Sequence, residues 1–119
     1  MKKLYIIDDS DFDHELVRAG LEKATFEYEA YHALSLDEID LEKAAQVDLV
    51  LSDLNLIGHD KIQTLTRLVE LFPHAKKAIM SGVEPLGLDE LIATYKLVGF
   101  VNKDDIVGSL AATLGGYLA

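Results

Sequence analysis

The chain has 119 residues, the natural size of one domain with a single core, and half of them are apolar, which excludes a disordered segment. It has no cysteine, which excludes disulfides, thiolate metal sites and cysteine nucleophiles and suits a reducing compartment. The formal net charge of −10, from 21 acidic and 11 basic residues, argues against nucleic acid or an anionic membrane as a partner.

Short apolar runs alternate with segments of helical periodicity along the whole chain. Strands are expected at residues 3–8, 26–33, 49–53, 77–80 and 99–102. Helices are expected at 11–24, at 36–45, from just after Asp60 to just before Pro73, at 88–97 and at 105–118. Five strand-then-helix units predict an α/β fold with a parallel sheet and helices on both faces.

Two of the helices have clear apolar stripes, and we expect these stripes to face the core. The start of the chain does not continue as an apolar segment, because Asp8 and Asp9 end it too early for a signal peptide. No stretch approaches the length that spans a bilayer, so we expect a cytoplasmic location. The expected stripes are Phe12, Leu16, Ala19 and Lys23 in the first helix and Ile62, Leu65, Val69 and Phe72 in the third.

Polar groups follow four of the expected strands. Asp8 and Asp9 follow the first strand, Asp53 ends the third, Ser81 follows the fourth and Lys103 follows the fifth. In an open parallel sheet these groups emerge along one edge, which is where ligands bind. Three acids, a hydroxyl and one ammonium in that place indicate a divalent metal and a phosphoryl group.

Four motifs carry a resemblance to a known family. In order and at the ends of the matching strands, they resemble the receiver domain of bacterial two-component response regulators, which is CheY-like. The resemblance covers essentially the whole chain and implies a flavodoxin-like (βα)5 fold, doubly wound around a parallel five-stranded sheet with strand order 2-1-3-4-5. The motifs are IDD at 7–9, LSDLNL at 51–56, MSG at 80–82 and FVNK at 100–103.

The end of the chain resembles one branch of this family. Residues 99–105 read GFVNKDD, which is similar to the NarL/LuxR type. Members of that branch carry a helix-turn-helix domain after the receiver. We expect a single receiver domain over 1–119 and no output domain within it.

The resemblance implies a phosphoacceptor and a metal site. Asp53 would receive a phosphoryl group from a sensor histidine kinase or a phosphotransfer protein, because a carboxylate is a competent nucleophile toward phosphorus. Asp8, Asp9, Asp53 and the backbone carbonyl of Asn55 would hold Mg²⁺, with Mn²⁺ able to substitute. Three acids in one place would repel one another without a cation.

The same resemblance implies a switch rather than a turnover enzyme. Ser81 and Lys103 would bind the phosphoryl oxygens, and Ser81 with Phe100 would change the surface, although Phe100 reads equally as a core residue. A homodimer or an output partner would then bind the face formed by helix 88–97, strand 99–102 and helix 105–118. The only chemistry implied is phosphorylation and dephosphorylation of the domain itself.

Three loop positions depart from the family pattern. Ile57 and Asp104 stand where the family often has proline, and Lys61 stands where it often has a glycine with a permissive backbone. We therefore expect local strain or a reshaped loop around Lys61. A cis peptide bond before Asp104 would be costly, so a different loop is the other alternative.

Two other functions stay open. A degenerate receiver would act as an interaction module that never takes phosphate. A haloacid-dehalogenase-like phosphatase would use the Asp-x-Asp spacing of Asp9 and Asp11, but the chain has no cap domain and no later acidic pair at a strand end. The histidines, His14, His32, His59 and His74, lack metal-ligand spacing and are expected to be surface or structural residues.

Overall fold

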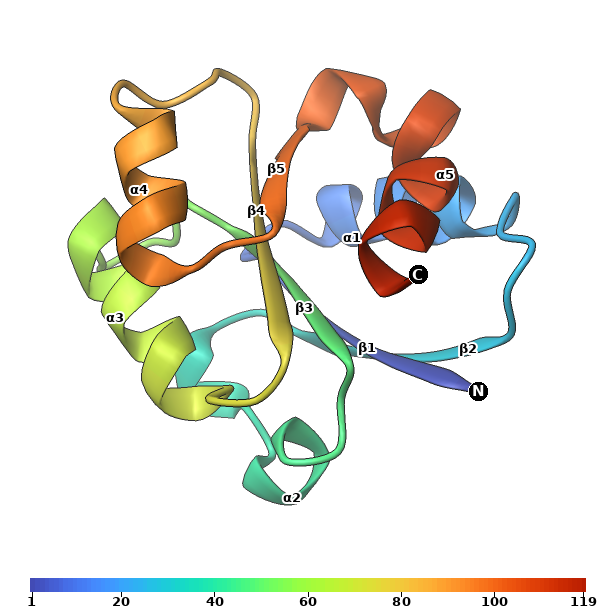
Figure 1. The fold of residues 1–119 in the computed structure, drawn as a ribbon, viewed down its shortest axis with the longest axis horizontal. Coiled ribbons are helices and arrows are strands. Elements are labelled where there is room, and N and C mark those ends of the chain that lie inside the picture. The colour runs from blue at the N-terminus through green and yellow to red at the C-terminus, as the bar shows by residue number, and fades with distance from the viewer.

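A computed structural model describes residues 1–119 as one α/β unit (Figure 1). The strands are β1 (Lys2–Ile7), β2 (Tyr28–Ala33), β3 (Leu49–Asp53), β4 (Lys76–Ser81) and β5 (Gly99–Asn102). The helices are α1 (Asp11–Leu21), α2 (Leu41–Ala44), α3 (Lys61–Leu71), α4 (Leu88–Tyr95) and α5 (Ile106–Leu118). Short 3₁₀ helices lie at Leu36–Glu38 and Lys103–Asp105.

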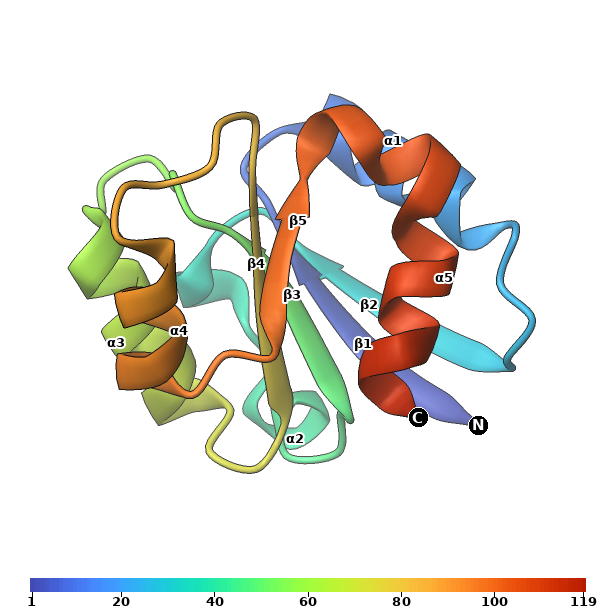
Figure 2. The same ribbon diagram turned by 45° about the horizontal axis from the view of Figure 1, so that its top comes forward.

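All five strands are parallel, and their order is β2-β1-β3-β4-β5. This order confirms the predicted doubly wound topology. Helices α1 and α5 cover one face of the sheet, and α2, α3 and α4 cover the other (Figures 1 and 2). The sheet is therefore buried on both faces, which explains why β3 is buried along its whole length.

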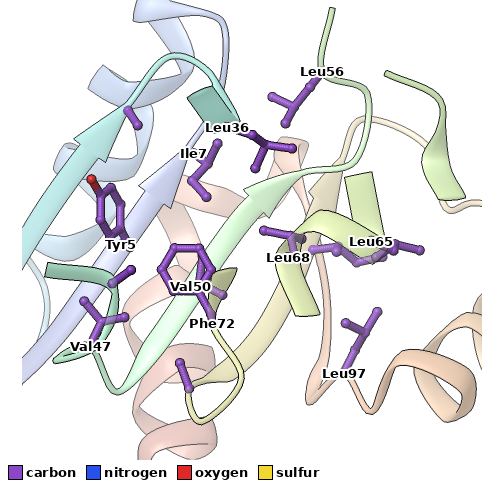
Figure 3. Close-up of a cluster of buried hydrophobic side chains, with 14 of the residues drawn as sticks. Tyr5, Ile7, Leu36, Val47, Val50, Leu56, Leu65, Leu68, Phe72 and Leu97 are labelled. Atoms are coloured by element: carbon purple, nitrogen blue, oxygen red, sulfur yellow. The ribbon is translucent and has the colours of Figure 1, made fainter. Parts of the chain in front are cut away.

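Two apolar cores, one on each face, hold the sheet in place. Side chains of β1 alternate between them: Leu4 and Ile6 join the core under α1 and α5, while Tyr5 and Ile7 join the core under α2–α4. In the second core the rings of Tyr5 and Phe72 lie 5.6 Å apart, edge to face (Figure 3). Each fully buried large apolar side chain stabilises the fold by about 1.5–3 kcal/mol, so the strand ends that carry the polar groups are rigidly placed.

The predicted helix at 36–45 is wrong as a continuous helix. Ile39 interrupts it in an extended conformation, with φ −64° and ψ 125°. The Asp40 side chain then caps a new helix by accepting hydrogen bonds from the Glu42 and Lys43 backbone N–H groups. Tyr5 Oη also accepts a 3.1 Å hydrogen bond from the Asp40 N–H, so a contact from β1 stabilises the break.

The predicted stripe of α1 is wrong at Phe12 and Lys23, which are exposed, while Leu16 and Ala19 are half-buried and Leu16 packs against the core. Phe12 is 70% exposed, and the buried side of the helix is made instead by His14, Val17, Gly20 and Leu21. Gly20 shows why the helix is turned this way. A Cβ at Gly20 would lie 2.6 Å from the Ile106 carbonyl oxygen, so only glycine allows α1 to pack this closely on α5.

The stripe of α3 is half right. Leu65 is fully buried and Phe72, just beyond the last turn, is 1% exposed, but Ile62 and Val69 are exposed at 54% and 39%. Leu68 takes the central place in the core. The N-terminal capping box at Asp60 is confirmed, because the Asp60 and Gln63 side chains each accept a hydrogen bond from the other residue's backbone N–H.

The loop departures are resolved without strain at Lys61. Lys61 is the first residue of α3, and the left-handed residue of this loop is Gly58, with φ 85°. All peptide bonds are trans, including the bond before Asp104, which lies in a 3₁₀ helix. None of the helices has both the length and the apolar character needed to cross a membrane.

Candidate functional site

The carboxyl ends of four strands meet at one edge of the sheet. Ladder pairing sets Ile7 beside Ser52 and Asp53 beside Met80, so these ends lie at the same level. The polar groups that the sequence singles out therefore emerge together. Asp8 and Asp9 follow β1, Asp53 ends β3, Ser81 ends β4 and Lys103 follows β5.

Three carboxylates form a tight cluster at this edge. One oxygen each of Asp8, Asp9 and Asp53 lies within 4.8 Å of the others. Two loop amides orient them: the Asn55 N–H donates to Asp53 Oδ1 at 3.1 Å, and the Ile57 N–H donates to Asp9 Oδ2 at 2.8 Å. Ile57, one of the departures from the family pattern, thus supplies a backbone bond that holds Asp9 in the cluster.

Asp8 is the most deeply placed of the three, with no exposed surface. Burial raises the pKa of its carboxyl, and the neighbouring Asp53 carboxylate raises this pKa further, while Lys103 and the Ser10 N–H act in the opposite direction. The Ser10 N–H donates to Asp8 Oδ1 at 3.0 Å. Asp8 Oδ2 is buried, and the Lys103 ammonium lies 2.9 Å from it as an ion-pair partner.

Lys103 places one ammonium among several carboxylates. Its Nζ lies 2.9 Å from Asp8 Oδ2, 3.4 Å from Asp53 Oδ2 and 2.8 Å from Asp13 Oδ2. Burial alone would lower the pKa of this ammonium, but the bonds to Asp13 and Asp8 and the attraction of Asp53 raise it above its usual value. Lys103 is therefore a permanent cation at this site.

These residues fit a hard divalent cation. The cluster of Asp8, Asp9 and Asp53 offers three carboxylates within 4.8 Å of one another, and the single ammonium of Lys103 balances only one of their charges. Carboxylate and carbonyl oxygens are the ligands that Mg²⁺ prefers.

Ser81 joins the site through Asn55. The Asn55 Nδ2 donates a 3.1 Å hydrogen bond to Ser81 Oγ, which also accepts a 3.4 Å bond from the Val83 N–H. An open pocket of about 250 Å³ lies against Ser81 and Asn55 and extends toward Lys61 and Leu86. The Ser81 hydroxyl therefore lies beside space that a ligand can enter.

The comparisons with known proteins give the fold. No family model and no curated protein matches this sequence. Chemotaxis protein CheY4 of Vibrio cholerae is 21% identical over 98% of both chains, with a TM-score of 0.76. A response regulator receiver domain protein of Clostridium thermocellum is 20% identical over 99% of this chain and 94% of that one, with a TM-score of 0.80. The receiver domain of the stress response regulator RcsB from Escherichia coli is 16% identical over 98% and 92%, with a TM-score of 0.78.

The chain has the receiver fold. Within it, the structure brings together Asp8, Asp9, Asp53 and Lys103, as the strand-end pattern predicts. Phe100 is half-buried and packs against the apolar core under α2–α4.

Sequence reasoning missed two features of this candidate site. Asp13, in the first turn of α1, gives Lys103 its shortest contact. His14 is buried, and its Nε2 lies 2.8 Å from the Asp8 backbone carbonyl while its Nδ1 lies 2.7 Å from Nδ1 of His32. The prediction that these histidines are structural fits this geometry. An acid in the first turn of a helix that starts at the sheet edge was the available signal for Asp13.

Proposed function

We propose that this chain is a phosphorylation-controlled signalling receiver, in which Asp53 accepts a phosphoryl group. The donor is the phosphohistidine of a sensor histidine kinase or a phosphotransfer protein. The observation that carries the proposal is the placement of Asp53 Oδ2 at 3.4 Å from the Lys103 ammonium, beside Asp8 and Asp9, at the ligand edge of a receiver fold.

The chain's own residues supply most of what phosphoryl transfer requires. The Asn55 N–H holds Asp53 Oδ1, so Oδ2 faces Lys103. An Asp53 oxygen forms the new bond to phosphorus, the bond from phosphorus to the donor nitrogen breaks, and its electron pair returns to the donor imidazole. Lys103 and the Ser81 hydroxyl are placed to bind the phosphoryl oxygens.

A metal completes the charge balance. Asp8, Asp9, Asp53 and the backbone carbonyl of Asn55 would hold Mg²⁺, or Mn²⁺ in its place. When bound, the ion supplies positive charge that neutralises the carboxylates and the phosphoryl oxygens.

Acetyl phosphate or phosphoramidate tests the proposal directly. With Mg²⁺ present, intact-mass measurement should show one base-labile phosphate on the wild type and none on Asp53→Asn, because an amide is not a nucleophile here. Asp89→Asn, which removes an exposed acid of α4, is the matched control and should be labelled normally. Label that persists in Asp53→Asn would place the acceptor elsewhere. A wild type that binds Mg²⁺ but takes no phosphate would be the phosphate-independent interaction module.

We also propose that phosphorylation changes the face formed by α4, β5 and α5, through which a homodimer or an output partner binds. Helix α4 has no fully buried residue, so its packing is the weakest of the four long helices. Drawing the Ser81 hydroxyl toward a phosphoryl group would break its bond with Asn55 and loosen its bond with the Val83 N–H, which holds the loop before α4. Phe100 packs on this side and is positioned to follow.

Amide NMR with beryllofluoride, which mimics the aspartyl phosphate, tests this switch. We expect shifts around Phe100 and along α4, and a weaker response in Ser81→Ala. Ser109→Ala removes a hydroxyl that donates only to the carbonyl of Asp105, the residue before α5, and should respond like the wild type. Shifts confined to the carboxylate cluster would contradict the switch and leave the phosphorylation site standing.

The proposed function includes the branch of the receiver family. Residues 99–105 and the RcsB structures among the similar folds support a NarL/LuxR-type receiver. Signalling by this domain alone would need a partner rather than DNA, because its net charge is −10.

A further inference from the structure

The ammonium of Lys103 is shared unequally among three carboxylates. Its contact with Asp13 Oδ2, at 2.8 Å, is the shortest and has the geometry of a hydrogen bond. Its distance to Asp8 Oδ2 is 2.9 Å, and its distance to Asp53 Oδ2 is longer, at 3.4 Å. The Lys103 ammonium therefore lies closer to Asp13 than to the proposed acceptor, Asp53.

Asp13 has no part in the metal cluster. The carboxylates that approach one another within 4.8 Å are Asp8, Asp9 and Asp53, and Asp13 is not among them. Its backbone N–H donates to Ser10 Oγ at 3.3 Å, which caps α1 and fixes the place of Asp13 in the first turn. The side chain is free to bond Lys103, and no other hydrogen bond of that side chain exists in the structure.

A phosphoryl group on Asp53 must compete for the same ammonium. It would bring about 1.5–2 negative charges and several strong acceptor oxygens to the Asp53 side of Lys103. The Asp13 and Lys103 side chains are 19% and 18% exposed, so their attraction is only partly screened by water. Moving the ammonium to the phosphoryl oxygens would give up that bond.

On the basis of the proposed function, we propose that Asp13 is a positioning residue that holds Lys103 off Asp53 and thereby weakens the binding of a phosphoryl group. Asp13 stabilises the unphosphorylated arrangement and thereby lowers the affinity of the site for a phosphoryl group. Removing its charge should release Lys103 to the phosphoryl oxygens.

Beryllofluoride binding in saturating Mg²⁺ tests this role. We expect Asp13→Asn to lower the Kd about five- to tenfold, which corresponds to about 1–1.4 kcal/mol. The replacement is isosteric and leaves the Ser10 cap intact, because the cap bonds the backbone of Asp13. Asp13→Glu keeps the charge and should return the Kd to within about twofold of the wild type, as a purely structural role would not require.

Asp11→Asn is the matched control. Asp11 lies in the same first turn and carries the same charge, but it is exposed and has no contact with Lys103. The Asp11→Asn variant therefore shows the effect of removing one negative charge near the start of α1 without removing a bond to Lys103. The Kd for Mg²⁺ without beryllofluoride should be the same in the Asp13→Asn and Asp11→Asn variants, because neither acid belongs to the metal cluster.

The outcomes are distinct. A wild type that binds beryllofluoride, with tighter binding in Asp13→Asn alone, supports the proposal. If Asp13→Asn binds no better than Asp11→Asn, or binds more weakly, the competition is refuted while the phosphoacceptor site stands. A wild type that binds no beryllofluoride overturns both the site and the role of Asp13.

Discussion

A pair of histidines, the buried His14 and the half-buried His32, should make the stability of this protein depend on pH. His14 Nε2 lies 2.8 Å from the Asp8 carbonyl and 3.1 Å from the Ala33 carbonyl, so this nitrogen carries a proton that it donates. His14 Nδ1 must then accept, and His32 Nδ1, at 2.7 Å, must donate to it. Protonation of His32 would add a positive charge to this half-buried pair, close to Arg18 and His14, so the neutral form of His32 is favoured.

The size of the effect follows from the His32 pKa. Burial lowers this pKa from 6.5 to about 4, and the positive charge of Arg18 and the neighbouring His14 act in the same direction. Because the folded-state pKa lies below the unfolded one, the stabilisation is complete above about pH 6.5 and is lost as pH falls toward 4. At pH 5 the full loss would be about 2 kcal/mol, and partial exposure of the ring reduces the expectation to about 1 kcal/mol.

Urea unfolding at about pH 7.5 and about pH 5, without Mg²⁺, measures this loss. His32→Asn keeps a donor near the position of Nδ1 but cannot titrate, so it should lose about 1 kcal/mol less than the wild type. His74→Asn removes an exposed histidine and should behave like the wild type. Equal losses in the wild type and in His32→Asn would refute the neutral pair, since the carboxylates titrate in both.

Two further predictions concern packing and the metal. Gly20→Ala should destabilise the fold by about 1–3 kcal/mol in urea unfolding, because its Cβ would meet the Ile106 carbonyl oxygen at 2.6 Å. Gly108→Ala in α5, with no atom near its Cβ, should be neutral or stabilising, and equal losses would refute this packing. Mg²⁺ should raise the melting temperature, because at a hundredfold excess over its Kd it adds about 2.7 kcal/mol to the free energy of unfolding. Asp9→Asn should remove most of this rise. If the melting temperature of the wild type does not change with Mg²⁺, the proposed metal site is contradicted.

The fold and the strand-end residues were predictable because they depend on local pattern. A run such as 49–53, buried throughout and closed by Asp53, identifies a central parallel strand and places its last residue at the ligand edge. The capping box at Asp60 was readable for the same reason, since both of its bonds lie within four residues.

The rotation of α1 and the break in the second helix were not predictable, because distant residues determine them. Gly20 faces α5 only because Ile106 lies opposite, 86 positions along the chain by their numbers (106 − 20). Asp40 begins a new helix partly because Tyr5 of β1 accepts its N–H. Apolar periodicity in α1 pointed to Phe12 instead, which is exposed. The role of Asp13 was not predictable for the same reason, since its bond to Lys103 exists only when α1 lies beside the end of β5.

The excess of negative charge at the sheet edge explains why this site should respond to ligands. Counting Asp13, four carboxylates lie around one ammonium, which contacts three of them, and burial of Asp8 already raises the pKa of its carboxyl. The two apolar cores keep these groups in place despite their repulsion, because the sheet that carries them is buried on both faces. A dication relieves the repulsion, and a phosphoryl group restores it on the Asp53 side. Under the proposed switch, a change at Lys103, which lies between Asp13 and Asp53, would reach α4 through β5.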